Sequence, residues 1–133
     1  MPAEKIAIGS PLYSHGWRMK APGRGTAGVP AEPIEDMTWR EVRALETAAA
    51  AEGIPGWHAG YDEEKGAAWL WNDDPASGDH LKFISYESAA SLDAKLAYIR
   101  ENGLGGLIVW QVHGDSMEDG WPMITRMHTG LWP

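Results

Sequence analysis

The most hydrophobic segment of the chain lies within residues 103–115, where apolar side chains run without interruption from Leu107 to Trp110 and resume at Val112. Glycines stand on both sides of this run. A short apolar run between turn residues predicts a β-strand that is buried on both faces. Strands of this kind occur in parallel sheets that are covered by helices.

The segment before this strand has helical periodicity. Ser88 is a suitable N-cap, and Leu92, Leu96 and Ile99 recur at helical spacing over residues 88–102. Near the start of the chain, residues 4–13 alternate apolar and small side chains and predict a second short strand. We expect these two strands to be parallel and to be joined by a crossover through the helix.

Between these strands the pattern predicts a helix followed by a small antiparallel sheet. Thr38 and Glu41 form a capping-box pattern that predicts a helix start. Three strands follow, separated by polar turns, at residues 56–62, 67–72 and 80–87. Helices combined with parallel strands give an α/β fold class.

Two stretches have weaker patterns. Residues 20–37 are rich in Gly, Pro and Ala and show no periodicity, which predicts a long loop. Residues 121–127 predict a short final helix.

Composition narrows the possible functions. The net charge of −8 disfavours nucleic-acid binding, because phosphate contacts need clustered Lys and Arg. No apolar run approaches the roughly 20 residues of a membrane span, and the first residues lack the apolar core of a signal peptide. Localisation therefore stays open. The chain has eight Trp and one Phe, and indoles suit both protein interfaces and sugar-binding platforms.

Residues 83–115 resemble the end of a glycoside hydrolase family 18 chitinase. The stretch from Phe83 to Ser88 is similar to the family's "Y-D-D-x-x-S" segment, and Leu-Gly-Gly-Leu-Ile-Val-Trp is similar to its "G-G-x-x-x-W" strand. Residues 5–13 are similar to the seventh-strand pattern "K-I-x-x-G-x-P-x-Y". This chain departs from the family at Ser14 and His15, which stand where Gly-Arg is usual.

The resemblance implies the C-terminal part of a TIM barrel that carries a small α+β chitinase insertion domain. Residues 1–19 and 88–133 would form the partial barrel, with two parallel strands and a crossover helix, and residues 20–87 would form the insertion domain. A complete barrel needs about 200 residues or more, so 133 residues supply only part of one.

The chemistry implied by the resemblance is incomplete in this chain. Family 18 hydrolysis uses the substrate's own acetamido group together with a protonating Glu in a D-x-x-D-x-D-x-E motif. That motif is absent from this sequence, so we assign no catalytic residue. The acidic clusters, which include Asp62, Glu63 and Glu64, are assigned to solvated turns.

What remains by resemblance is part of a substrate groove. Trp110 would form the floor beneath a sugar ring, and Tyr13 would lie at the mouth of its strand. Tyr61 and Trp69 would lie on the wall that deepens the cleft. Packing in the core is the alternative role for each of these side chains.

Cofactor and metal chemistry receive no support from the sequence. The five His show no i, i+4 pair and there is no Cys, so we expect no zinc site and no other cofactor. No serine lies in a Gly-x-Ser-x-Gly elbow.

Three interpretations therefore stay open. The first is the C-terminal part of a chitinase, secreted if the complete protein is one. The second is a non-catalytic carbohydrate-binding or interaction module derived from a chitinase, and the third is a truncated product without a function of its own. Expected partners are chitin or chito-oligosaccharide, and either the missing N-terminal barrel half or a second copy of the chain to cover the strand edges.

Overall fold

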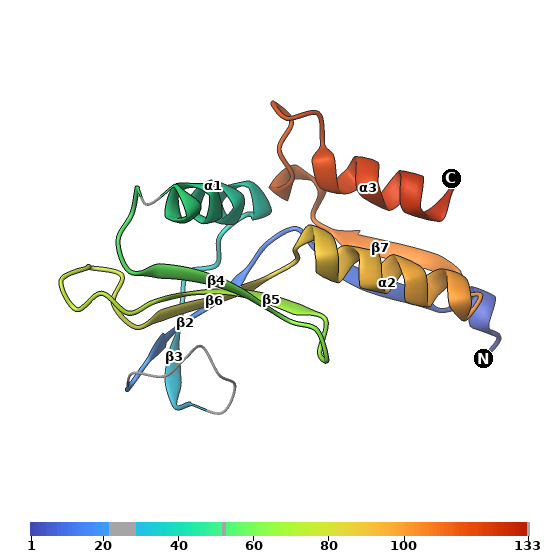
Figure 1. Cartoon of the computed structure of the whole chain (residues 1–133). Helices are drawn as coiled ribbons and strands as arrows, with labels where there is room; N and C mark the ends of the chain where they lie inside the picture. Colours follow the sequence, from blue (N-terminus) through green and yellow to red (C-terminus); the bar gives the residue numbers. More distant parts are fainter. Residues whose placement is uncertain (22–28, 52, 133) are drawn as a thin grey trace.

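The computed structural model describes residues 1–21, 29–51 and 53–132. It contains two sheets, a parallel pair of strands and a five-stranded antiparallel sheet. Figure 1 shows the two sheets side by side, with the chain passing from one to the other and back. The α/β class and the parallel strand pair are both as the sequence predicts.

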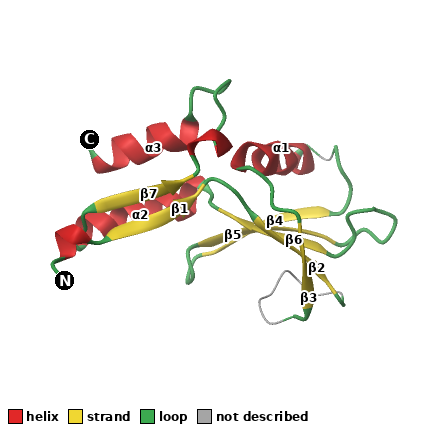
Figure 2. Cartoon of the chain, turned by 180° about the vertical axis from the view of Figure 1, so that it is seen from behind, coloured by secondary structure: helices red, strands yellow, loops and turns green. Residues whose placement is uncertain are grey.

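The parallel pair is formed by β1 (Ala7–Pro11) and β7 (Gly106–Trp110), which align in register from end to end. Two helices, α2 (Ala89–Glu101) and α3 (Pro122–Leu131), pack on one face of this pair, as Figures 1 and 2 show from opposite sides. The core between them consists of Leu12, Trp39, Leu92, Leu96, Met123 and Met127. A short 3₁₀ turn stands beside each strand, at Ala3–Lys5 and Val112–Gly114.

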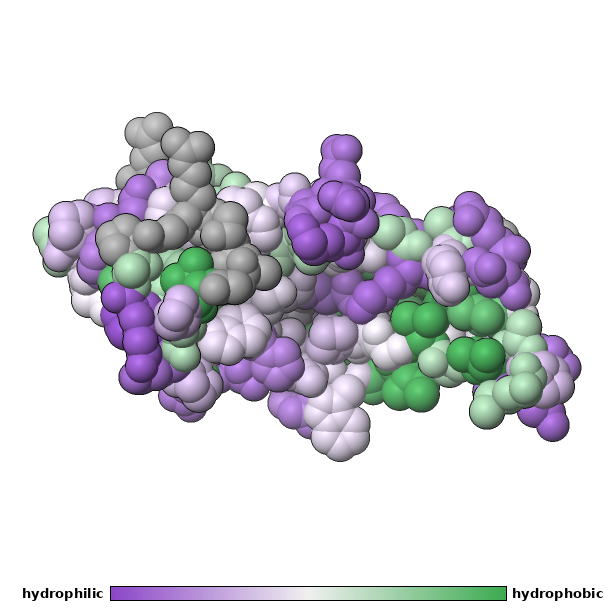
Figure 3. Space-filling view, turned by 90° about the horizontal axis from the view of Figure 1, so that it is seen from below, coloured by the Kyte–Doolittle hydropathy of each residue, from purple (hydrophilic) through white to green (hydrophobic). Residues whose placement is uncertain are grey.

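The expectation that the β7 strand is buried on both faces is wrong. Leu107 and Val109 pack against the core, but Ile108 is 60% exposed and Trp110 is 67% exposed. Successive side chains of a strand point to opposite faces, and α2 and α3 cover only one of them. Figure 3 shows hydrophobic surface gathered over this end of the molecule on the uncovered side.

The antiparallel sheet has the strand order β3-β2-β6-β5-β4. The three predicted strands are confirmed, and two more strands precede them in the chain. The bounds are β2 (His15–Met19), β3 (Ala31–Ile34), β4 (Trp57–Asp62), β5 (Ala67–Asn72) and β6 (Lys82–Tyr86).

The prediction of one long loop over residues 20–37 is therefore wrong at β3, while residues 22–28 lie outside the described residues. β3 is a four-residue edge strand that contains Pro33, and prolines are tolerated at sheet edges. β2 pairs with β6, so the antiparallel sheet already begins at His15, before the expected boundary at residue 19.

Helix α1 (Trp39–Ala50) covers one face of the five-stranded sheet. Its apolar side packs on alternate residues of β4, β5 and β6, and the resulting cluster contains Val42, Trp57, Ala68, Leu70, Ile84 and Tyr86. Among the described residues, no helix is long and apolar enough to cross a membrane.

Candidate functional site

Trp110 ends β7 at the carboxyl edge of the parallel pair. It lies opposite Pro11 in register, and its carbonyl accepts a hydrogen bond from the N–H of Leu12 at 2.8 Å. The backbone of this residue is therefore fixed, while the indole remains largely exposed on the uncovered face. This is the arrangement expected of an aromatic side chain that contacts a ligand.

Tyr13 lies two residues beyond β1, where the chain leaves the parallel pair and enters the antiparallel sheet. It forms an isolated bridge with Thr38, and its ring meets that of His15 edge-on with centroids 5.2 Å apart. The buried Ser14 fixes this junction. Its N–H donates to the carbonyl of Met37 at 2.7 Å, and its hydroxyl accepts from the N–H of Met37 at 3.0 Å.

Trp69 lies on β5, on the face of the antiparallel sheet opposite α1. Its ring is stacked with that of Phe83, with centroids 6.4 Å apart, and Phe83 in turn lies 6.1 Å from Trp17. Trp17 is 6.0 Å from His15, whose ring contacts Tyr13. We call this row of five rings, Tyr13, His15, Trp17, Phe83 and Trp69, the aromatic ladder.

The sequence reasoning missed most of this ladder, although a signal was present. In the Trp-Leu-Trp stretch of β5, the middle residue Leu70 is fully buried and the two indoles are only half-buried. Alternation of this kind places both indoles on the non-core face.

Tyr61 lies on the opposite face of the same sheet. It pairs with Ala68, which belongs to the core beneath α1, whereas Trp69 pairs with Gly60. The expected wall thus has its two aromatics on different faces, and no single groove surface of this sheet contains both.

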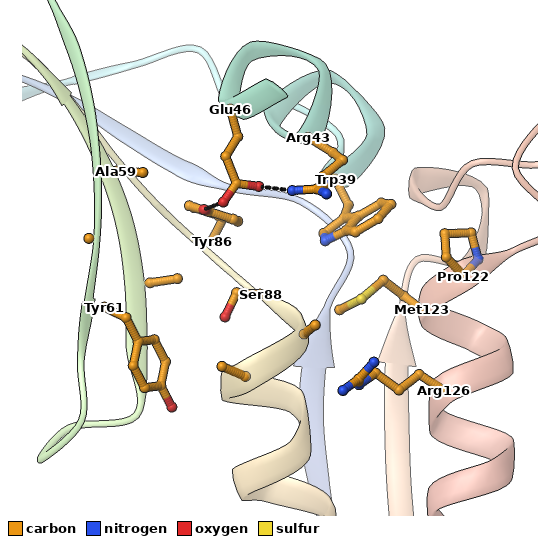
Figure 4. Close-up of a pocket in the computed structure, with 14 residues that line it drawn as sticks. Trp39, Arg43, Glu46, Ala59, Tyr61, Tyr86, Ser88, Pro122, Met123 and Arg126 are labelled. Atoms are coloured by element: carbon orange, nitrogen blue, oxygen red, sulfur yellow. Dashed lines mark hydrogen bonds and ion pairs between the residues drawn. The ribbon is translucent and has the colours of Figure 1, made fainter. Parts of the chain in front are cut away.

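Tyr61 instead lines a cavity of about 530 Å³ between α1, β4 and the beginnings of α2 and α3. Figure 4 shows Tyr61 on one side of this space and Arg126 on the other. Above them, Glu46 accepts hydrogen bonds from Arg43 at 2.6 Å and from the hydroxyl of Tyr86 at 2.9 Å. Burial raises the pKa of Tyr86 well above its ordinary value, and the neighbouring Glu46 carboxylate adds to this effect.

Glu87 is a buried carboxylate that accepts from three side-chain donors. It is 3% exposed and accepts from the hydroxyls of Ser10 at 2.8 Å and Ser91 at 2.5 Å, and from the Lys95 ammonium at 2.5 Å. Its backbone carbonyl accepts from the indole of Trp39 at 2.8 Å. The residue ties β1, α1 and α2 together, so its role is structural.

Two further acidic residues also hold the backbone. Asp62 accepts from both the N–H and the ammonium of Lys65, and these contacts lower its pKa. Asp115 is fully buried and accepts from the N–H groups of Ser116 at 2.9 Å and Ile124 at 2.8 Å, which fixes the start of α3. Across the described parts of the chain, no group of three or more His, Asp or Glu side chains is placed to hold a metal ion.

Comparison with known proteins shows what most of the chain is similar to. The family model of glycosyl hydrolases family 18 matches residues 1–115. Chitinase A1 of Niallia circulans is 31% identical over 121 residues, which cover 86% of this chain and 16% of that protein.

Solved structures share the fold. A mutant class V chitinase from Nicotiana tobaccum in complex with NAG4 gives a TM-score of 0.78 at 18% identity, covering 99% of this chain and 36% of that one. The chitinase-like agglutinin RobpsCRA from Robinia pseudoacacia gives a TM-score of 0.74 at 20% identity, covering 98% of this chain and 33% of that one. The chain spans 16% of the length of Chitinase A1 of Niallia circulans and 16% of the length of Chitinase A of Pseudoalteromonas piscicida.

Proposed function

Because this chain belongs to glycosyl hydrolases family 18, we propose that it is the C-terminal part of a chitinase-type enzyme. In this role it supplies part of the groove that binds β-1,4-linked N-acetylglucosamine polymers, and it does not supply the catalytic acid. The match confirms the family expected from the sequence motifs. That this chain supplies groove residues while another part of the enzyme supplies the acid is our proposal.

The observation that carries the proposal is the position of Trp110. Side chains at the carboxyl ends of parallel strands form the active sites of TIM barrels, and Trp110 is at that end of β7 with 67% of its surface exposed. A hydrophobic side chain so exposed on a fixed backbone offers its flat face to a ligand. The apolar face of a pyranose ring is complementary to an indole face, and Tyr13 offers a second ring where β1 ends.

In this proposal the catalytic acid comes from a part of the enzyme outside these 133 residues. The sequence contains no D-x-x-D-x-D-x-E motif. The best-defined buried carboxylates, Glu87 and Asp115, have their oxygens committed to hydrogen bonds within the fold. A proton donor for a glycosidic oxygen must instead reach the substrate with a transferable proton.

The test combines binding and turnover by the 133-residue chain. We expect no release of fluorophore from a chitotriose glycoside above background, since general acid catalysis alone is worth roughly 10²- to 10⁴-fold. We expect weak binding of chitotriose in calorimetric titrations, reduced roughly fivefold to tenfold in Trp110→Ala, because the stacking face is removed.

Trp132→Ala is the matched control. Trp132 is 68% exposed, close to the exposure of Trp110, but it follows the last residue of α3 and belongs to neither sheet. Equal loss of binding in both variants would contradict a specific role for Trp110. Robust turnover would contradict the proposal that this chain lacks the catalytic acid. Asp62, Glu63 and Asp115 would then be the first residues to test as proton donors.

The alternative is a non-catalytic carbohydrate-binding or interaction module derived from a chitinase. The exposed indole of Trp110 is compatible with it, because an indole can bind a sugar without hydrolysis. The two functions are separated by the coding sequence directly upstream. A D-x-x-D-x-D-x-E reading frame there makes the chain part of an enzyme, and its absence leaves the binding module and the truncated product as the remaining interpretations.

A further inference from the structure

A cavity of about 410 Å³ lies on the α1 side of the five-stranded sheet, the side opposite the aromatic ladder. Figure 1 shows the segment that rises from β3 to α1, and this segment forms part of the cavity wall. The lining contains neither Trp110 nor any ring of the ladder. Cavities of roughly 300–1,000 Å³ that combine apolar walls with a few polar groups are typical binding sites for small molecules.

The floor of this cavity is apolar, and a glycine gives it its shape. Gly16 on β2 stands between Ile34 on β3 and Ile84 on β6 in the register of the sheet. A Cβ on Gly16 would lie 2.7 Å from Cγ1 of Ile34, so the Ile34 side chain lies over bare backbone. Met37 and Leu45 extend the apolar lining toward α1. The floor therefore offers contacts to the apolar body of a bound molecule.

The charged groups around this floor are mostly negative. The lining contains four carboxylates and one ammonium group, which belong to Glu35, Asp36, Glu41, Asp79 and Lys82. Negative charge is therefore in excess by three. A cleft whose charges are of one sign and whose walls have a low dielectric concentrates the field inside it. The cavity consequently attracts a cation.

These carboxylates are only partly engaged within the fold. Glu41 accepts from Thr38 through Oε2, and Asp79 pairs with Lys82 through Oδ1 at 2.5 Å. The other oxygen of each can accept from a further donor. Glu35 is exposed and lines the cavity as well. Acceptors for an ammonium group are therefore present.

Trp57 supplies an independent indication of a bound molecule. Its side chain lines the cavity and the residue is 7% exposed, yet its indole N–H has no hydrogen-bond partner among the described residues. A buried donor without a partner is unfavourable, and buried polar groups are ordinarily paired. An acceptor atom on a bound molecule would satisfy this N–H.

We propose that this cavity binds a small protonated amine that has an apolar body and a hydrogen-bond acceptor. The ammonium group lies among the carboxylates, the apolar body lies on Ile34 and Ile84, and the acceptor binds the N–H of Trp57. A neutral sugar offers no charge to the carboxylates, and an inorganic cation offers nothing to the apolar floor. The proposal is independent of the function proposed for Trp110.

The experiment compares three related probes in calorimetric titrations of the 133-residue chain. Tyramine has the ammonium, the ring and a hydroxyl acceptor, whereas 4-ethylphenol lacks the ammonium and phenethylamine lacks the hydroxyl. At low ionic strength tyramine binds roughly tenfold more tightly than 4-ethylphenol and roughly fivefold more tightly than phenethylamine. An affinity for tyramine no higher than that for either comparison compound overturns the proposal, as does Mg²⁺ binding as tight as that of tyramine.

Substitutions then assign each group of the probe to its partner. Glu35→Gln and Asp79→Asn each lower the tyramine affinity roughly threefold to tenfold. Trp57→Phe keeps an aromatic ring but removes the N–H, so it lowers tyramine affinity to that of phenethylamine and leaves phenethylamine binding unchanged. Ile34→Ala lowers the affinity for both amines, because apolar contacts are lost while the charges remain.

Glu64→Gln is the matched control for loss of a carboxylate. Glu64 is exposed in the turn between β4 and β5, outside the cavity lining, and its substitution leaves tyramine affinity unchanged. Equal losses in Glu64→Gln and Glu35→Gln overturn the proposal. Circular dichroism establishes that each variant is folded, and Glu35→Gln, on the surface, decides the outcome if Trp57→Phe is unfolded.

Two further measurements separate this cavity from the groove. Tyramine raises the midpoint of thermal unfolding, because the unfolded chain has no cavity to bind it. Trp110→Ala leaves tyramine affinity unchanged, and chitotriose does not compete with tyramine. Loss of tyramine binding in Trp110→Ala would place the probe on the exposed indole and would overturn the proposal. Failure of chitotriose binding alone refutes the groove and leaves the tyramine result standing.

Discussion

At the residue scale, Glu87 holds the two sheets in their relative positions. Its carboxylate accepts hydrogen bonds from β1 through Ser10 and from α2 through Ser91 and Lys95. Glu87→Gln keeps the shape but removes the charge and turns an amide donor toward these donors. We expect the free energy of unfolding in urea to fall by about 2–3 kcal/mol, because a hydrogen-bonded buried charge is lost. Glu101→Gln is the control, since Glu101 is exposed at the end of α2 and should change stability by less than about 0.5 kcal/mol. Equal effects of the two substitutions would refute the structural role of Glu87.

At the element scale, the start of α1 depends on ionised Glu41. Its carboxylate accepts from the N–H of Thr38 at 2.7 Å and from the Thr38 hydroxyl at 2.6 Å, and these bonds lower the pKa of Glu41. A carboxyl whose pKa is lower in the folded state stabilises the fold above its unfolded value of 4.5, and the contribution is lost as the pH falls through the folded pKa. Glu41→Gln should therefore lower the free energy of unfolding by about 0.5–1 kcal/mol at neutral pH and by less in acid.

Urea unfolding of Glu41→Gln and the parent chain at neutral and acidic pH measures this difference. Glu118→Gln, in the exposed loop before α3, is the control, and its effect should be small at both pH values. A Glu41→Gln effect that does not shrink in acid would show that the helix start does not depend on the charge.

At the scale of the whole molecule, the uncovered face of β1 and β7 should drive association. Ile108 and Trp110 are exposed there, and Val112, just beyond the end of β7, is 51% exposed. Among the described residues β1 and β7 pair only with each other, so each has one unpaired edge. We expect the sedimentation coefficient of the chain to rise with concentration, and Ile108→Lys to suppress this rise by placing a charge on the face. Met117→Lys is the control, because Met117 is 68% exposed in a loop outside both sheets. A monomer at every concentration would refute the expectation.

The sequence by itself determined the elements whose pattern is local and the family to which the chain belongs. Periodic apolar residues and a capping box predicted α1 and α2, and a weaker pattern predicted α3. An uninterrupted apolar run predicted β7, and short runs between turn residues predicted β1, β4, β5 and β6. The capping contact between Thr38 and Glu41 spans one helical turn, so it too follows from neighbouring residues. β2 and β3 escaped prediction because a Gly and a Pro interrupt short strands that only pairing with β6 and with each other stabilises.

Only the tertiary structure decided which face of each strand is covered. Leu107 and Ile108 are equally apolar, yet α2 and α3 lie over the first and leave the second exposed. Tyr61 and Trp69 are both aromatic, yet the strand register places them on opposite faces of one sheet. Burial depends on elements distant in the sequence, whereas periodicity reports only on neighbours. The register and the position of α1 therefore decided that the aromatic ladder faces outward.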